Sequence, residues 1–210
     1  SSANPNAWIN AWTASSVGIT HKANLTNAAE AWSLVKLDAL GPTTLGGGDV
    51  IGGDLGVSGQ TSLASTIRQE IDGTEALRFL FTNTAIRASV DLSRLYVDDD
   101  ANTFNFNEAG RLQALDAHGN VVAEVTFAGN SLTGSRSVEL AHGGGFSALV
   151  ISAGAYDTNQ VFVPGAYMDD DGRFAEAYSA GGKLHASDFL VSSIEFEMAA
   201  IIGVVPDQGI

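Results

Sequence analysis

Alternation of apolar and polar residues recurs along most of this chain, and it limits the fold more than any other feature of the sequence. In one such run, Leu77, Phe79 and Phe81 are separated by Arg78 and Leu80. Successive side chains of a β-strand point to opposite faces, so this period of two predicts half-buried antiparallel strands. Similar runs cover residues 32–37, 86–93, 121–127 and 189–198, and residues 146–151 are nearly all apolar.

Turn signals separate these runs. They are Asp72-Gly73, His118-Gly119-Asn120, Gly143-Gly144-Gly145 and Gly181-Gly182. Many short strands with such punctuation predict an all-β protein, an antiparallel β-sandwich of jelly-roll-like form with little helix. Two stretches, about 97–110 and 155–187, are too long for hairpin turns, and we interpret them as two long calcium-binding loops. We expect residues 32–202 to form the sandwich, residues 1–31 an extension packed on it, and residues 203–210 a tail or linker.

The charge balance restricts the partners. The chain has 10 Lys and Arg against 24 Asp and Glu, a formal net charge of -14. Such a field repels nucleic acid and anionic lipid, so we expect neither as a partner. There is no cysteine, which excludes disulfides and thiolate metal sites. No apolar run is long enough to span a bilayer, so we expect no membrane insertion.

Clustered carboxylates point to calcium, which takes six to eight oxygen ligands. The candidate metal ligands are Asp49, Asp54, Glu70, Asp72, Asp98, Asp99, Asp100, Asp169, Asp170, Asp171 and Asp188. Adjacent carboxylates repel one another unless a cation offsets them, although solvated acidic turns are the alternative interpretation. The run Asp98-x-Asp100-x-Asn102 matches the first three ligand positions of an EF-hand loop. It then departs from that pattern, because Thr103 replaces the required Gly and Ala109 the bidentate Glu.

Motifs of common enzyme classes are missing from the sequence. Neither H-E-x-x-H nor G-x-S-x-G occurs, and the glycine-rich segment 46–56 lacks the Lys of a phosphate-binding loop. The acidic clusters are too crowded to single out an acid and a nucleophile for glycoside hydrolysis. We therefore expect a binding protein and no enzyme.

Several segments resemble one family in their order and spacing. They are Gly53-Asp54-Leu55-Gly56-Val57, residues 70–79 (EIDGTEALRF), residues 110–122 (GRLQALDAHGNVV) and Ser187-Asp188-Phe189-Leu190-Val191. Together they resemble the peptide-binding domain near the distal end of giant repeats-in-toxin (RTX) adhesins of Gram-negative bacteria. The resemblance spans roughly residues 32–198.

That resemblance implies a calcium-dependent β-sandwich, a monomeric module of a longer chain on the bacterial surface. Such a domain grips the C-terminal end of a protein on a host or neighbouring cell, in adhesion or biofilm formation. Several Ca²⁺ ions are expected, one of which coordinates the free carboxylate of the ligand. The resemblance makes Glu70 and Asp72 ligands of a structural calcium. We expect the walls of the ligand site among Tyr156, Tyr167, Phe174 and Tyr178.

Two other binding functions stay open at this point. A calcium-dependent carbohydrate-binding module could use the same kind of sandwich, although Trp8, Trp12 and Trp32 all fall in the first sixth of the chain. A structural spacer of an adhesin stalk is the other, but spacers are usually near ~100 residues and lack two long ordered loops.

Overall fold

Every regular element of the described chain is a β-strand. The computed structural model describes residues 9–10, 17–34, 54–57, 70–97, 107–157, 159–169, 174–175 and 184–199. Within these residues there is no helix, and hence none of the length and apolarity that crossing a membrane requires. The strands are β1 (Ile9–Asn10), β2 (Val17–Lys22), β3 (Ser33–Leu34), β4 (Ile71–Asp72), β5 (Ala76–Ser93), β6 (Ala109–Leu115), β7 (Val121–Ala128), β8 (Arg136–Tyr156), β9 (Phe162–Pro164), β10 (Tyr167–Asp169), β11 (Phe174–Ala175), β12 (Leu184–His185) and β13 (Asp188–Met198).

Ten of these strands share one continuous antiparallel hydrogen-bond network. Its main order is β1-β13-β5-β8-β6-β7. Off this path, β2 pairs with β3 and β5, β4 pairs with β13, and β9 pairs with β8. A separate three-stranded sheet has the order β11-β10-β12.

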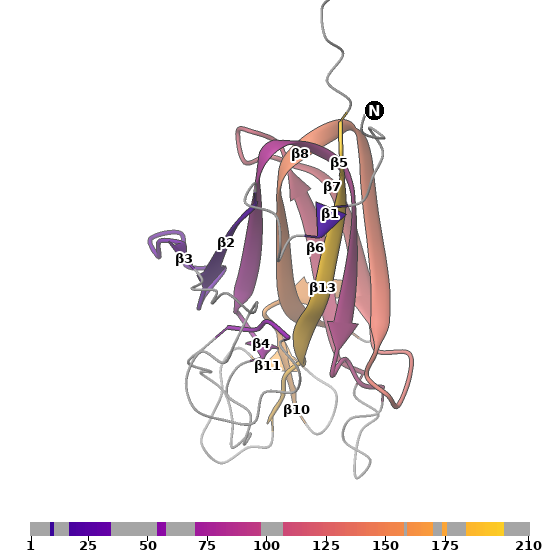
Figure 1. Cartoon of the computed structure of the whole chain (residues 1–210). Coiled ribbons are helices and arrows are strands. Elements are labelled where there is room, and N and C mark those ends of the chain that lie inside the picture. The colour runs from indigo at the N-terminus through magenta and orange to yellow at the C-terminus, as the bar shows by residue number, and fades with distance from the viewer. Residues whose placement is uncertain are drawn as a thin grey trace, which may run out of the picture.

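The long pair β5 and β8 folds this network into two layers. Residues 76–80 of β5 pair with 148–152 of β8, whereas residues 87–92 pair with 136–141. Between these halves the register shifts on both sides of Ala85, and Gly145 has a φ of +78°. An irregularity of this kind bends a strand and increases its twist. Figure 1 shows both strands arching over one end of the molecule, so that each strand contributes to both layers.

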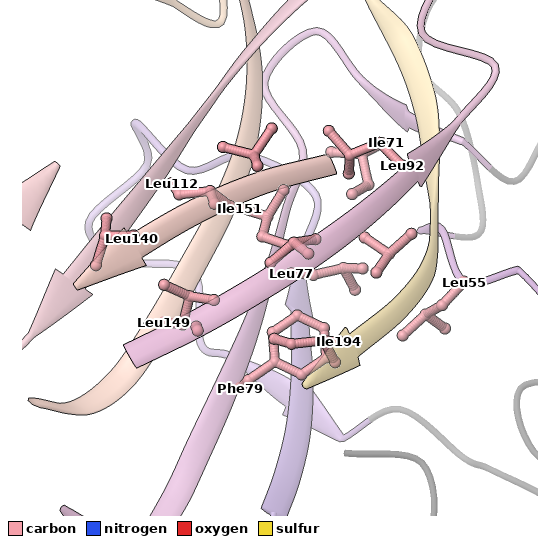
Figure 2. Close-up of a cluster of buried hydrophobic side chains, with 14 of the residues drawn as sticks. Leu55, Ile71, Leu77, Phe79, Leu92, Leu112, Leu140, Leu149, Ile151 and Ile194 are labelled. Atoms are coloured by element: carbon pink, nitrogen blue, oxygen red, sulfur yellow. The ribbon is translucent and has the colours of Figure 1, made fainter. Parts of the chain in front are cut away.

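The two layers enclose one apolar core. β13 continues the layer built on the second half of β5, while β2, β6 and β7 belong to the other layer. Phe127 of β7 meets Phe189 of β13 edge to face, with ring centroids 5.6 Å apart. Figure 2 shows Leu77, Phe79, Ile151 and Ile194 within the same cluster of buried side chains. Each such side chain contributes about 1.5–3 kcal/mol on burial, so this cluster dominates the stability of the sandwich.

The structure confirms the predicted all-β antiparallel fold, with two changes in how the strands are divided. The runs 77–81 and 86–93 are halves of one strand, β5. Gly143-Gly144-Gly145, expected to be a turn between strands, lies inside β8. A sheet corner needs the same conformational freedom as a hairpin turn, so local sequence does not distinguish them. A jelly-roll connectivity and calcium-binding loops stay predictions.

Two regions expected to lie outside the strands contribute strands. Residues 155–187, expected to be a long loop, include β9 and the three-stranded sheet of β10, β11 and β12. These strands have two or three residues each, which is too short for a period of two to be detected. Residues 1–31 include β2, which pairs along β5 from Val17–Phe81 to Lys22–Ala76.

Gly110 tests whether the two layers pack as closely as described. A Cβ at this position of β6 would lie 2.5 Å from Cζ of Phe127 and 2.8 Å from Cζ of Phe189. Both rings are fully buried and have little room to move. We expect Gly110→Val to lower the free energy of unfolding by about 2–3 kcal/mol, measured by urea denaturation. Gly143→Val is the control, because a Cβ at Gly143 meets no atom within 4 Å. It should change stability by less than about 0.5 kcal/mol, and an equal loss in both variants would contradict this packing.

Candidate cation-binding carboxylate cluster

Acidic residues from separate stretches of the chain gather at one end of the sandwich. β4 pairs with the start of β13, which places Asp72 opposite Asp188 and Ile71 opposite Phe189. Ile71 and Phe189 are fully buried, so the hydrophobic core fixes the backbone that carries the two aspartates. We refer to Asp54, Glu70, Asp72, Glu75 and Asp188 as the carboxylate cluster.

A tight turn between β4 and β5 brings Glu75 back onto Asp72. The Glu75 N–H donates to the Asp72 carbonyl at 2.8 Å, and the Asp72 N–H donates to Oε2 of Glu75 at 3.1 Å. Gly73 has a φ of +50°, and the ring of Tyr167 occupies the space that a Cβ would need. Only glycine meets both requirements, so Gly73 fixes the geometry of this turn.

The far end of β5 supplies the cation that faces the cluster. Nε of Arg94 donates to Oε1 of Glu70 in a direct ion pair. Next to it, Ser93 Oγ donates to Oδ2 of Asp54 at 2.5 Å. Arg94 has a φ of +61°, which is uncommon for a residue other than glycine and costs on the order of 1 kcal/mol. The ion pair with a buried carboxylate offsets that cost.

Burial dominates the electrostatics of the two glutamates. Glu70 and Glu75 have no exposed side-chain surface, and Asp72 is 1% exposed. The pKa of Glu70 is raised to about 7, chiefly by desolvation; Asp188 and Asp72 contribute to this rise, and Arg94 opposes it. Desolvation also raises the pKa of Glu75 to about 8, where the hydrogen bond from the Asp72 backbone opposes the shift. In the metal-free protein, both carboxyl groups are therefore substantially protonated near neutral pH.

Two carboxylate oxygens in the cluster are buried and lack a partner. Among the described residues, neither Oε2 of Glu70 nor Oε1 of Glu75 accepts a hydrogen bond. Buried oxygens of this kind suit hard cations, which bind carboxylate and carbonyl oxygens. The residues that the structure describes contain no group of three or more His, Asp or Glu already arranged to hold a metal ion. The cluster thus supplies oxygen ligands without forming a closed coordination shell.

The structure brings together three of the predicted metal ligands, namely Glu70, Asp72 and Asp188. A fourth, Asp54, accepts a hydrogen bond from Ser93, the neighbour of Arg94. The residues Asp49, Asp98, Asp99, Asp100, Asp170 and Asp171 lie outside the described part of the chain. Asp169 is the last residue of β10, and its side chain lies outside the description as well. Calcium coordination by these loops stays a prediction.

Of the four aromatic residues expected to line a ligand site, Tyr156 and Tyr167 have described side chains, and Tyr167 contacts the cluster region. It is 8% exposed and packs on Gly73. Tyr156 ends β8 and meets Phe162 edge to face, at 5.5 Å between ring centroids. The backbone of Phe174 pairs with Met168, while its side chain and all of Tyr178 lie outside the described residues.

Glu108 is a buried acid at this end of the sandwich that the sequence analysis missed. Its side chain has no exposed surface, and Oε2 accepts a hydrogen bond from the Tyr96 N–H. The next residue, Ala109, donates its N–H to Oγ of Ser187, the neighbour of Asp188. A single acid before a strand gives no distinctive sequence signal. Its position immediately before the apolar–polar alternation of residues 109–115 was the only hint.

Comparisons with protein-family models, with curated proteins and with solved structures found no match for this chain. The protein is therefore classified by its fold and its carboxylate cluster alone. It is an antiparallel β-sandwich that carries a buried carboxylate cluster at one end.

The raised pKa values of Glu70 and Glu75 predict how stability depends on pH. Both exceed the ordinary value of 4.5, so the folded protein binds protons more tightly than the unfolded chain. The resulting stabilisation is complete below about pH 4.5 and is lost as the pH rises through about 7 and 8. In EDTA, we expect the free energy of unfolding to fall by roughly 2 kcal/mol or more between pH 5 and pH 8.

Urea denaturation at several pH values measures this dependence. Glu75→Gln removes one titrating group while keeping its shape, so the slope should become shallower above pH 6. A wild-type profile that stays level or rises from pH 5 to pH 8 would contradict the electrostatics described above.

Proposed function

We propose that this chain is a calcium-dependent binding module of a bacterial surface adhesin, which grips the C-terminal end of a partner protein. The observation that carries the proposal is the pair of buried, unpartnered carboxylate oxygens, Oε2 of Glu70 and Oε1 of Glu75. The resemblance of residues 32–198 to the RTX peptide-binding domain supports the same class of function.

The composition of the cluster favours a bound cation. Glu70, Asp72, Glu75 and Asp188 lie close together, and Arg94 is the cation that faces them among the described residues. Without a further cation, these carboxyl groups must take up protons or repel one another. A divalent ion would keep them ionised and use the free oxygens.

The ligand chemistry supports calcium over other metals. The chain has no cysteine, and its candidate ligands are all carboxylates, which suit calcium or magnesium. Magnesium requires near-ideal octahedral geometry, whereas calcium accepts irregular sets of six to eight oxygens. Acidic residues contributed by a turn, a strand end and separate segments match the less demanding ion.

A calcium ion also explains how so acidic a chain could hold a carboxylate ligand. A formal charge of -14 repels a free C-terminus at long range. A bound divalent cation reverses the local field and can coordinate a ligand oxygen directly. The neighbouring ring of Tyr167 would then form part of the apolar wall near that cation.

Calcium should stabilise the folded protein. At about a hundred times its Kd, a ligand adds about 2.7 kcal/mol, which raises Tm by roughly 5–10 °C for a domain of this size. Thermal unfolding in EDTA and in excess calcium measures this shift. Asp188→Asn should reduce the shift, because Asp188 lies opposite Asp72 in the cluster. Glu195→Gln, an exposed position on the same strand, should preserve it. Equal Tm values with and without calcium would exclude a structural calcium site.

The C-terminal grip predicts dependence on a free carboxylate. Peptides selected from a panel with free C-termini should bind in calcium and be released by EDTA. Amidation of the same peptides should weaken binding by about a hundredfold or more, because it removes a charged partner from the cation. Calorimetry or fluorescence anisotropy gives the affinities. Unchanged affinity after amidation would overturn the grip, and binding to glycans with displacement by free sugar would favour the carbohydrate alternative.

A further inference from the structure

A second site lies on the outer face of the layer formed by β2, β6 and the adjoining halves of β5 and β8. It is a cavity of about 180 Å³, and the residues around it include Leu25, Thr26, Thr74, Arg111, Ser152 and Pro164. The side chains of the carboxylate cluster do not line it. Its volume equals that of about six liquid water molecules, which suits a small organic molecule.

Arg111 and Ser152 are cross-strand neighbours at this cavity. They are paired in register on β6 and β8, and both side chains point away from the core, because Leu112 and Ile151 point into it. Ser152 is only 2% exposed although it lies on an outer face. The Gly165 N–H donates to the carbonyl of Ala153, so the end of β9 lies beside this part of β8.

Both residues carry donors that lack acceptors. Among the described residues, neither Nε of Arg111 nor Oγ of Ser152 has a hydrogen-bond partner, and both atoms are buried. The guanidinium has a 3.5 Å contact from Nη1 to the half-exposed Glu124, and it faces the ring of Phe162 at 5.9 Å. Neither interaction uses the Nε–H. Buried donors without partners are uncommon in native proteins and call for an explanation.

The surrounding charges favour an anion at this point. Strand pairing puts Lys22 and Arg111 on one crosswise row, with Ala76 and Ser152 between them. Arg78 projects from the same face and donates its Nε–H to Thr20 Oγ1. A chain with a net charge of -14 therefore gathers three cationic side chains on one face of this layer, of which Lys22 is buried.

We propose that this cavity binds a small free carboxylate that carries a short apolar tail. The carboxylate would accept hydrogen bonds from the Arg111 guanidinium and the Ser152 hydroxyl, since the planar fork of arginine matches a carboxylate in geometry and charge. Because the contact to Glu124 is long and exposed, the guanidinium can turn toward the occupant at little cost. The side chains of Leu25 and Pro164 would contact the tail.

This site requires no calcium, so its test is independent of the adhesin function. The probe is butyrate, added to the full chain in EDTA at constant ionic strength, with butyramide as the neutral analogue. Nitrogen–proton correlation NMR follows the Nε–H resonances, and the Arg111 resonance is assigned by its loss in Arg111→Met. We expect that resonance to shift and saturate with butyrate, with a Kd on the order of 1 mM, and to stay in place with butyramide.

Variants separate this site from general charge attraction. Arg111→Met should weaken butyrate binding by at least about tenfold, and Ser152→Ala should weaken it by about threefold or more. Arg78→Met is the matched control, because Arg78 lies on the same face but its Nε–H is already used by Thr20. It should leave the affinity within about twofold, as expected for a charge that does not contact the bound carboxylate.

Three results would overturn the proposal. One is the absence of a saturating shift of any Nε–H resonance in the wild-type spectrum on addition of butyrate, a measurement that does not depend on any variant folding. The second is an equal response to butyramide, and the third is equal weakening by Arg111→Met and Arg78→Met. None of these bears on calcium binding at the carboxylate cluster, so failure here would leave that proposal standing.

Discussion

The unbroken pairing of β5 with β8 around the corner of the sandwich is the constraint on which the rest of the structure depends. Because both strands bend and return, the start and the end of β5 reach the same end of the molecule (Figure 1). That is how Glu70, just before β4, meets Arg94, just after β5, across 24 residues of sequence. The same bend turns the inner faces of the two halves toward each other, so one hairpin provides both walls of the core. Removing the bend in β5 and β8 would therefore both separate the residues of the carboxylate cluster and expose the core.

The sequence could predict the strands and their faces, but not how they connect. Inward positions such as Phe79 and Phe196 follow from alternation alone, because a strand with one buried face leaves a period of two. The corner at Gly145 could not be predicted, since glycines mark a turn and a bend equally well and only the long-range pairing decides. Asp54, Glu70, Asp72 and Asp188 were found as candidates because acids beside glycine and strand ends are visible in sequence. Their convergence, and the part played by Glu108, depend on contacts between distant segments.

Burial of the carboxylate cluster is the property that would favour the binding of a cation. Desolvation makes the ionised form of Glu70 and Glu75 costly, which is why their pKa values rise to about 7 and about 8. The cation proposed for this cluster would therefore compete with protons for the same oxygens, and its binding would release protons near neutral pH. Arg94 neutralises only part of the charge, because it bonds one oxygen of Glu70 and leaves the other without a partner. In a cluster with several fixed cations, those cations would neutralise the carboxylates, and the cluster would have no affinity for a further cation.

The turn at Gly73 and Thr74 joins the two sites proposed for this chain. These two residues line the outer cavity, while their neighbours Asp72 and Glu75 belong to the carboxylate cluster. A divalent cation that displaces the proton of Glu75 brings two positive charges for the one removed, so it would attract an anion in the cavity and favour joint occupancy. Ordering of the shared turn acts in the same sense, because whichever ligand binds first has already met the entropic cost for the second. Linkage requires the effect to be mutual, so calcium must change the affinity for the carboxylate by the same factor as the carboxylate changes that for calcium. Both effects have the same sign, so the two ligands are expected to bind cooperatively, and the close fit of Tyr167 against Gly73 leaves little disorder to remove, which makes charge the larger of the two effects.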